Sequence, residues 1–429
     1  MIGGLFKSSS RVAMIAAAGL LSGGVAAQAA DLGGNCCADL EERVAELEAT
    51  TARKGNTKVS LEVSGHVHEA LVYYDVSGTG STVTDESGFN IGTHNSSRSR
   101  FRFKGSATIS ADWSAGFLME LGIRANHLGS VDQSNYLDTR GLDVRHEALW
   151  IKSKTLGTVW LGWTSSAADG ITEICLGCSL GQTADWSSVL SGYDGTTRAF
   201  ALNGSPGFAF NGDGDRREVI KYVSPTIAGF SFSAAAGPEQ FGDVALRYAG
   251  EFGAFRVAAG VGYQWELTDT RANQASSTQN LNGTPFLISQ TNCNGINADN
   301  DCEILGASAS IMHSPSGVYV AGAYGHTENN KLAAGVSNDS ESFFITAGIN
   351  SKWNSLGKTN LWAGYWYAEN NMGAVADHGE LEQFGLGINQ KIDAAAMDLY
   401  VHWRHVEAER NNVDEGEADF VTAGAIIRF

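Results

Sequence analysis

Residues 420 to 429 read Phe-Val-Thr-Ala-Gly-Ala-Ile-Ile-Arg-Phe and end on an aromatic side chain. Apolar residues hold one parity, namely Val421, Ala423, Ala425, Ile427 and Phe429, and the other parity is mostly small or polar. A period of two gives a β-strand one apolar face and one polar face. A strand with lipid on one face and water on the other is typical of a membrane β-barrel. This stretch therefore predicts the last strand of such a barrel, provided that the pattern recurs.

The composition fits that interpretation. The 429 residues include 52 glycines and only 5 prolines, and 10% are aromatic. No segment approaches 18 uninterrupted apolar residues, so membrane-spanning helices are not expected. The net charge of -18 argues against nucleic acid as a partner, because its binders carry basic patches.

The N-terminus has the features of a secretory signal over residues 1–29. Lys7 and Arg11 precede an apolar run, and Ala27-Gln28-Ala29 is a small-residue cleavage site. A polar leader, 30–57, follows. Within it, apolar side chains at heptad spacing over 39–54 predict a short helix, which is either a solvated leader or a small periplasmic coiled coil.

We expect a single β-barrel domain of sixteen antiparallel strands over residues 58–429. The predicted strands are 58–75, 97–110, 115–127, 143–153, 158–164, 217–224, 230–236, 242–249, 255–265, 303–313, 318–326, 341–350, 358–368, 380–390, 396–406 and 418–429. Short turns alternate with long loops, except for one short connection near Pro238, as in a barrel with a periplasmic and an external rim. An even number of strands returns Phe429 to the periplasmic side.

Three predicted strands show a clear outward face. The outward residues are Val59, Leu61, Val63, Val67, Leu71 and Tyr73 in the first, Phe255, Val257, Ala259, Val261, Tyr263 and Trp265 in the ninth, and Met397, Leu399, Val401 and Trp403 in the fifteenth. Strands 143–153 and 358–368 show no clear face.

The second predicted strand carries a ladder of positive charge. Residues 97–104 read Ser-Arg-Ser-Arg-Phe-Arg-Phe-Lys, which places Arg98, Arg100, Arg102 and Lys104 on one face. A cation pointing into mid-membrane hydrocarbon costs roughly 2–4 kcal/mol. We therefore expect the ladder to line the lumen, although a strand of a soluble protein could show the same pattern. Other expected wall charges are Glu120, Arg124, Arg217, Lys221 and Arg247.

The loop of about fifty residues from Ser165 to Arg216 is too long to be a simple connection. It carries Asp169, Glu173 and Asp185. Folded inward, it would oppose acidic groups to the basic wall, and the transverse field would favour dipolar solutes. The alternative is an external lid.

The six cysteines are Cys36, Cys37, Cys175, Cys178, Cys293 and Cys302. Export to an oxidising compartment favours local disulfides between Cys175 and Cys178 and between Cys293 and Cys302. The spacing does not favour a metal site.

Two stretches resemble alphaproteobacterial general porins. They are residues 35–50, which read Asn-Cys-Cys-Ala-Asp-Leu-Glu-Glu-Arg-Val-Ala-Glu-Leu-Glu-Ala-Thr, followed by 58–74, and residues 223–230, which read Val-Ser-Pro-Thr-Ile-Ala-Gly-Phe. The terminal Phe429 also fits the family, whereas the loop cysteines do not match its pattern.

The resemblance implies a trimeric outer-membrane barrel of sixteen strands whose third external loop narrows the channel. It implies a constriction between Arg98, Arg100, Arg102 and Lys104 on the wall and Asp169, Glu173 and Asp185 on the loop. The expected partners are outer-membrane lipid and lipopolysaccharide, two further copies of the chain, and the barrel-assembly machinery, which would read the strand ending at Phe429.

We therefore expect passive diffusion of ions and small hydrophilic solutes, without cofactor, metal or chemistry. The main alternative is a substrate-specific channel for a sugar, phosphate or similar solute, in which Trp186, Tyr193 and Phe200 of the loop would contribute a binding site. An enzyme is disfavoured because the ten histidines show no Ser/His/Asp grouping. A structural adhesin would conduct nothing. Ion preference stays open, since net charge favours cations and the arginines favour anions.

Overall fold

The computed structural model describes residues 58–77, 86–94, 97–126, 128, 141–180, 182, 212–238, 240–268, 277–279, 285–287, 300–331, 338–370, 379–410 and 413–429. The chain divides into two units, 1–54 and 55–429, and only the second contains described residues. The predicted signal and leader, Cys36, Cys37, Asp185, Trp186, Tyr193, Phe200, Cys293 and the side chain of Arg124 lie outside the described part. Within that part, no helix has the length and apolar character needed to cross a membrane.

The described chain is almost entirely β-strand, and seventeen strands form one antiparallel sheet. These are β1 (Ser60–Ser77), β2 (Glu86–Thr93), β3 (Arg100–Thr108), β4 (Trp113–Arg124), β5 (Gly141–Ser153), β6 (Gly157–Ser165), β7 (Arg216–Val223), β8 (Phe230–Ala236), β9 (Gly242–Phe252), β10 (Phe255–Thr268), β13 (Asn300–His313), β14 (Val318–Asn329), β15 (Asp339–Ser351), β16 (Thr359–Asn370), β17 (Gly379–Ile392), β18 (Met397–Arg410) and β19 (Val413–Arg428). A separate pair, β11 (Ser277–Gln279) and β12 (Pro285–Leu287), lies within the connection from β10 to β13.

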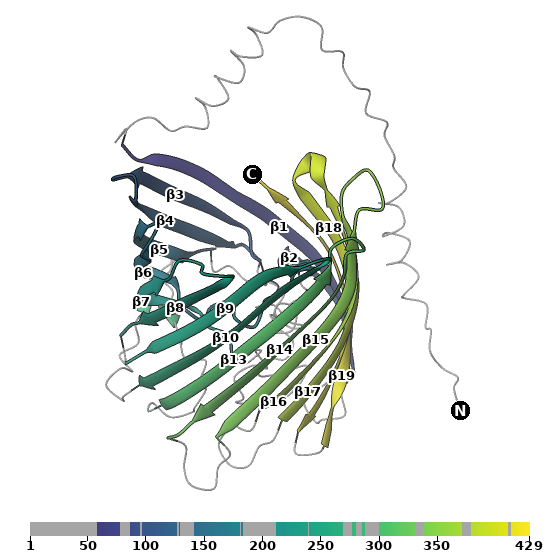
Figure 1. Cartoon of the computed structure of the whole chain (residues 1–429). Helices are drawn as coiled ribbons and strands as arrows, with labels where there is room; N and C mark the ends of the chain where they lie inside the picture. The colour runs from purple at the N-terminus through teal and green to yellow at the C-terminus, as the bar shows by residue number, and fades with distance from the viewer. Residues whose placement is uncertain are drawn as a thin grey trace, which may run out of the picture. The chain divides into compact units, whose positions relative to one another are not determined.

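Pairing of β1 with β19 closes the sheet into a barrel (Figure 1). The register runs from His66 opposite Arg428 to Ser77 opposite Glu417. At the end of the chain, the Gly65 and Phe429 backbones exchange two hydrogen bonds of 2.9 and 3.1 Å. Closure leaves no sheet edge, which a barrel in lipid requires because no water is present there to pair free backbone groups.

The prediction of sixteen strands is confirmed once β2 and β3 are counted as one wall position. Both pair with β1, β3 along its first half and β2 along its second. The sequence analysis missed β2 and assigned its residues to a loop. This segment contains two glycines, Gly88 and Gly92, and shows little alternation of apolar side chains.

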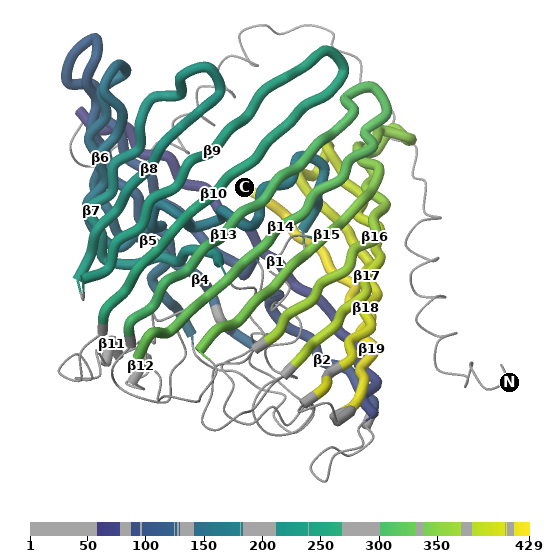
Figure 2. The backbone as a smooth tube through the Cα atoms, turned by 60° about the horizontal axis from the view of Figure 1, so that its bottom comes forward, coloured from purple at the N-terminus to yellow at the C-terminus, as the bar shows by residue number. Residues whose placement is uncertain are grey.

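The short turns gather at one end of the barrel (Figure 2). The turns after β9 and β13, for example, contain only 2 and 4 residues between the strand bounds. One predicted long loop is wrong: β18 and β19 extend as a hairpin, so that residues 411–412 connect them instead of 407–417. Backbone hydrogen bonds between β18 and β19 continue beyond the apolar residues that face the membrane, up to Arg410 opposite Val413.

The outward faces follow the prediction. Val67 is 48% exposed and Leu71 40%, whereas the alternating residues Ala70 and Val72 are buried. Phe255, Val261 and Trp265 of β10 are also outward and exposed. Lipid would cover these side chains, since apolar residues facing outward make the membrane-embedded surface of such a barrel.

The two strands without a predicted face have different explanations. In β5, a β-bulge opposite Glu120 changes the parity, so that Val144 and Leu149 are both exposed. In β16, both faces are apolar: Leu361 is exposed, while Trp362 and Trp366 point inward and are buried.

The inward aromatic residues of β16 belong to a larger group that we call the interior cluster. Its members are Ala70, Val72, Tyr74, Val76, Leu128, Ala323, Phe344, Trp362, Trp366, Ala368, Leu381, Tyr400, Val406, Ala418 and Phe420. The wall members come from β1 and β14–β19, and Leu180 packs against the cluster. The inner face of the barrel is therefore apolar on this side of the lumen.

Gly65 tests the closure of the barrel. A Cβ atom at this position would lie 2.5 Å from the backbone oxygen of Arg100 and 2.7 Å from the Phe429 ring. We expect Gly65→Ala to lower barrel stability by about 1–3 kcal/mol, because neither strand can move aside without losing hydrogen bonds. The measurement is the temperature at which the folded form in detergent converts to the unfolded form on a gel. Ser64→Ala, at the neighbouring position, adds no volume and is the control; equal stability of both variants would contradict the packing.

Candidate functional site

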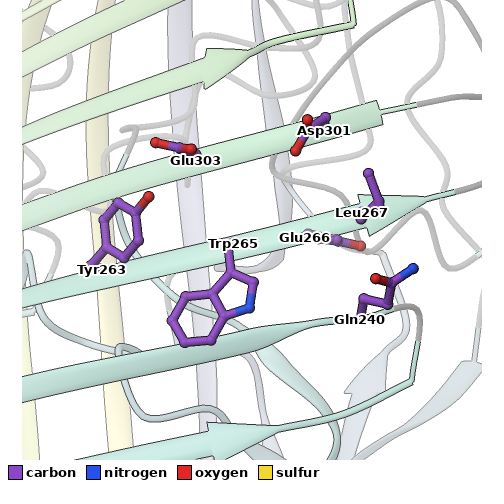
Figure 3. Close-up of a pocket in the computed structure, with 7 residues that line it drawn as sticks. All are labelled: Gln240, Tyr263, Trp265, Glu266, Leu267, Asp301 and Glu303. Atoms are coloured by element: carbon purple, nitrogen blue, oxygen red, sulfur yellow. The ribbon is translucent and has the colours of Figure 1, made fainter.

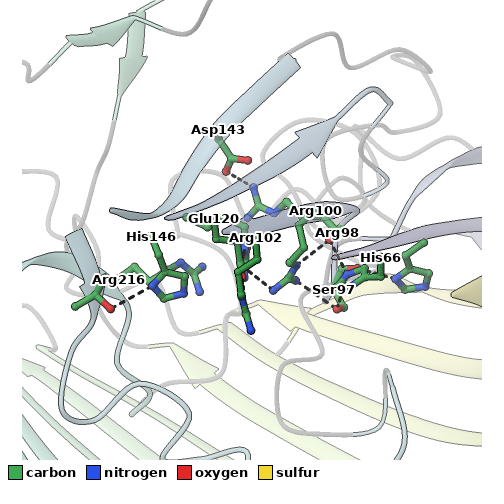
Figure 4. A network of polar contacts seen from close by, with 12 residues as sticks. His66, Ser97, Arg98, Arg100, Arg102, Glu120, Asp143, His146 and Arg216 are labelled. Atoms are coloured by element: carbon green, nitrogen blue, oxygen red, sulfur yellow. Dashed lines mark hydrogen bonds and ion pairs between the residues drawn. The ribbon is translucent and has the colours of Figure 1, made fainter. Parts of the chain in front are cut away.

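One inner side of the barrel carries a group of five arginines, which we call the arginine wall: Arg98, Arg100, Arg102, Arg145 and Arg216. Figure 4 labels Arg98, Arg100, Arg102 and Arg216. Arg100 and Arg102 alternate with outward residues along β3, Arg98 precedes that strand, Arg145 lies on β5 and Arg216 begins β7. The strands β3 to β7 are consecutive neighbours in the sheet, so the five side chains share one region of the wall.

Glu120 of β4 is the centre of this group. Its carboxylate is fully buried and accepts hydrogen bonds from Arg145 Nε at 2.7 Å, Arg102 Nε at 2.6 Å and Arg100 Nη1 at 3.2 Å. A buried carboxylate requires such partners, because an unpaired charge away from water is costly. Glu120 therefore fixes the positions of three guanidinium groups.

Arg145 reaches Glu120 because of the bulge in β5. Glu120 is opposite His146 and Leu121 is opposite Val144, so Arg145 is the extra residue. A bulge re-aims the side chain at its position, which is why bulges often occur next to functional sites. The sequence analysis missed Arg145, and the broken alternation of 143–153 was the signal that could have indicated it.

The wall keeps a net positive charge after pairing. Arg98 Nη1 lies 2.5 Å from Asp143 Oδ2, and Arg216 Nη2 lies 3.6 Å from Asp215 Oδ1. Five arginines thus face the three carboxylates of Glu120, Asp143 and Asp215, which leaves a charge of +2. Arg102 is the most accessible, with 43% of its side chain exposed. The arrangement can attract anions while its members stay rigidly oriented.

The loop after β6 folds into the barrel over residues 166–180 and 182, which we call the inner segment. Near its start the segment contacts β9: Ala168 N donates to Asp243 Oδ2 at 2.7 Å, and Arg247 Nη1 donates to Ala167 O at 2.8 Å. It then crosses β13, where Ser308 Oγ donates to the Ile171 oxygen. The alternative of an external lid does not hold for this segment.

The far end of the inner segment is bound to the opposite wall. Gln182 Nε2 donates to Tyr319 Oη of β14 at 2.5 Å, and Asn360 Nδ2 of β16 donates to Gln182 Oε1 at 2.8 Å. Asn350 Nδ2 of β15 donates to Gly177 O at 2.9 Å. The segment therefore crosses the inner wall from β9 to β16.

Two glycines allow the closest approach of loop and wall. A Cβ at Gly306 of β13 would lie 1.9 Å from Gly212 O and 2.9 Å from Ile171 Cγ2. A Cβ at Gly177 would lie 2.1 Å from the ring of Tyr319. Any larger residue at either place would move the loop away from the wall.

The predicted loop disulfide is present. Cys175 and Cys178 are joined within the inner segment, with their Cα atoms 5.5 Å apart. Cys302, at the start of β13, is also disulfide-bonded. The first disulfide closes a tight turn just where the segment passes from β13 to β14.

The predicted loop acids occupy different environments. Asp169 interacts electrostatically with Arg216 and Lys221. Glu173 is exposed on the inner segment. Burial inside the barrel, followed by the charge of Asp169, raises the pKa of the nearby Asp213 to about 8. Asp213 accepts a hydrogen bond from Ile171 N at 2.8 Å, and the sequence analysis did not single it out.

The remaining predicted cations are spread along the wall. Lys104 is exposed on β3, and Lys221 Nζ donates to the Ser165 oxygen. Arg217 is buried: its guanidinium lies 4.0 Å from the centre of the Phe241 ring and pairs with Glu266 at 3.0 Å. Arg217 therefore links β7 to β10 through its ion pair with Glu266, and its burial keeps it from contact with a solute.

One group of described side chains has the donor atoms of a metal site. Ligand atoms of His405, Glu407 and Glu417 lie within 4.8 Å of one another. All three are on the outward parity of β18 and β19, so an ion there would not line the channel.

Gly306 tests the position of the inner segment. We expect Gly306→Val to push the segment toward the lumen and to lower single-channel conductance, because the nearest atom of the loop is a backbone oxygen. Ala309→Val, on the outward face of the same strand, is the control and should conduct normally. Unchanged conductance of a folded Gly306→Val barrel would contradict the loop position.

Asp213 predicts a pH dependence. The raised pKa keeps this carboxyl protonated in the folded protein up to about pH 8. The stability that it contributes is fully present below the ordinary pKa of an aspartate and is lost as pH rises from there through the raised pKa. Ionisation also adds a negative charge beside Asp169. We expect the reversal potential in a salt gradient to shift toward cations between about pH 7 and about pH 9. The shift should be absent in Asp213→Asn, and its persistence there would refute the assignment.

Comparisons with solved structures show the same fold in other proteins. The anion-selective porin from Comamonas acidovorans is 14% identical, with a TM-score of 0.54, and the match covers 86% of this chain and 100% of that one. The in-vitro folded, trimeric form of OmpT, an outer membrane protein of Vibrio cholerae, is 15% identical with a TM-score of 0.51, covering 86% and 99%. The outer membrane channel DcaP of Acinetobacter baumannii is 10% identical with a TM-score of 0.56, covering 88% and 100%.

These structures share the barrel fold with this chain. No curated protein sequence matches it. Residues 12–426, however, match the sequence family described as Gram-negative porin, which favours a channel over an enzyme. The chain belongs to the Gram-negative porin family, and it forms a passive channel in the bacterial outer membrane.

Proposed function

We propose that the channel passes small hydrophilic solutes along the arginine wall and prefers anions. The observation that carries the proposal is the charge of +2 that remains after Glu120, Asp143 and Asp215 are paired. A solute in a narrow aqueous path with low-dielectric walls responds strongly to such a field. The neighbour from Comamonas acidovorans is itself anion-selective.

The constriction of this proposal lies between the arginine wall and the inner segment. Arg98, Arg100 and Arg102 supply the basic side, and Asp169 and Glu173 supply the acidic side, with Asp185 as a further acid of the same loop. Lys104 and Lys221 extend the basic side along the wall. The transverse field would orient dipolar solutes and disfavour apolar ones, which must displace ordered water.

The interior cluster favours a narrow path and, with it, a second candidate, a channel for a particular solute. Buried aromatic side chains occupy the inner face from β14 to β19, which leaves the solute path beside β3 to β7. Saturable block of ion current by one solute at low concentration would favour this candidate over general diffusion.

We further propose the assembly that the sequence resemblance to alphaproteobacterial general porins implies. Removal of residues 1–29 would be followed by recognition of the strand ending at Phe429 by the barrel-assembly machinery. The mature chain would form a homotrimer among outer-membrane lipid and lipopolysaccharide, with 30–57 as a periplasmic leader. The trimeric form of the Vibrio cholerae neighbour supports this oligomeric state.

Arg100 tests the proposed selectivity. Arg100→Ala lowers the net charge of the arginine wall and its carboxylates from +2 to +1, and an interaction of unit charges 4 Å apart in water is worth about 1 kcal/mol. We therefore expect the permeability ratio of chloride to potassium to fall roughly fivefold. The measurement is the reversal potential in a potassium chloride gradient across a planar bilayer.

Arg256→Ala is the matched control, because Arg256 is an exposed arginine that pairs with Glu251 outside the arginine wall. Equal reversal potentials for both variants and the wild type would overturn the proposal for the wall.

A further inference from the structure

A cavity of about 400 Å³ opens at the long-loop end of β10 and β13, apart from the arginine wall (Figure 3). Its lining includes the rings of Tyr263 and Trp265, the carboxylates of Asp301 and Glu303, and the amide of Gln240. Both rings are on the outward parity of β10 and are partly exposed. We call this the girdle cavity, because outward aromatic residues near strand ends form the belt, or girdle, of a membrane barrel at the membrane interface.

The backbone fixes the aromatic surface of the girdle cavity. Trp265 is paired with Gly242 of β9 on one side and with Glu303 of β13 on the other. A Cβ at Gly242 would lie 2.2 Å from Cζ2 of the indole, so the ring lies directly against the glycine. The centre of the Tyr263 ring is 6.1 Å from that of Trp265. A glycine beneath the indole thus provides a preformed aromatic surface.

The polar part of the girdle cavity is acidic. Glu303 accepts a hydrogen bond from the Tyr263 hydroxyl, which orients the carboxylate beside the two rings. Asp301 is on the same face of β13, two residues away. Of the described residues that line the cavity, none carries a positive charge. Glu266, a third lining carboxylate, is already paired with Arg217 at 3.0 Å, so the charge offered to a ligand is that of Asp301 and Glu303.

Gln240 marks the edge of the girdle cavity in the turn between β8 and β9. Its φ of 52° is in the left-handed region, which is uncommon for a residue other than glycine. Such conformations are found preferentially at ligand-binding and switch sites. Here the turn presents the amide beside Trp265, as Figure 3 shows.

Aromatic faces next to carboxylates are the combination that binds organic cations. A cation over an indole or phenol ring gains about 0.5–2 kcal/mol, and quaternary ammonium groups are recognised in this way. A metal ion keeps its hydration shell and gains little from the rings, and a neutral solute gains less from the carboxylates than a cation does. We propose that the girdle cavity binds an organic ammonium group, carried by a soluble amine or by the headgroup of a lipid.

Choline and its uncharged analogue 3,3-dimethylbutan-1-ol, which have the same shape, are the probes. The full-length protein is placed in phosphatidylglycerol nanodiscs, and binding is measured by isothermal titration calorimetry. We expect saturable binding of choline that weakens with added salt, and no binding of the neutral analogue. Trp265→Leu and Glu303→Gln should each weaken choline binding roughly tenfold.

Trp403→Leu is the matched control. Trp403 is an outward tryptophan whose Nε1 donates to the carboxylate of Asp419 at 2.9 Å, but it does not line the cavity. This variant should bind choline like the wild type. Channel conductance provides a check that each variant is folded. Absence of saturable binding, equal binding of the neutral analogue, or normal binding by folded Trp265→Leu would overturn the proposal.

A second lipid distinguishes the two sources of the ammonium group. In nanodiscs of phosphatidylethanolamine, a headgroup that occupies the girdle cavity would compete with choline and weaken its apparent binding in the wild type. Unchanged choline binding would identify a soluble amine as the ligand. In both lipids choline should bind more weakly to Trp265→Leu than to the wild type, and equal binding by the two proteins would overturn the site.

Discussion

The requirement that every backbone hydrogen bond in the lipid be made within the protein determines this structure. The first and last strands must meet, and the exchange of hydrogen bonds between Gly65 and Phe429 completes that contact at the end of the chain. Closure also fixes the parity of each strand, because a shift of one residue would turn an apolar face inward. The inward positions of arginine and glutamate therefore follow from the same constraint that orients leucine and valine toward lipid.

Within this frame, Glu120 organises the charged side of the lumen. Three arginines around one carboxylate repel one another, but each also forms a charge-assisted hydrogen bond with it. The result is a fixed surface whose positive charge exceeds what the carboxylates neutralise. Opposite it, the inner segment is held by hydrogen bonds from strands as far apart as β9 and β16. In the channel that we propose, selectivity would depend on side chains that are restrained before any solute arrives.

Periodicity predicted most of the barrel and part of the site. The alternation around Arg98, Arg100 and Arg102 placed them on one strand face, and Glu120 was expected on the wall. Arg145 was missed because a bulge interrupts the period of its strand, and a bulge depends on pairing with β4. β2 was missed because its residues carry little local preference and are held by β1. The inward face of the strand with Trp362 and Trp366 could not be predicted, because the side chains that cover these residues are distant in the sequence.

The interior cluster links the barrel wall to the connections that pack inside it. Tryptophan and phenylalanine side chains on the inner face of β15, β16 and β19 are shielded from water, with Leu128 and Leu180 from two connections against them. If these connections were shortened to widen the channel, the apolar side chains of the interior cluster would be exposed to water in the lumen. A design for a wider channel must therefore also replace these apolar wall residues with hydrophilic ones, since the wall and the connections that cover it depend on each other.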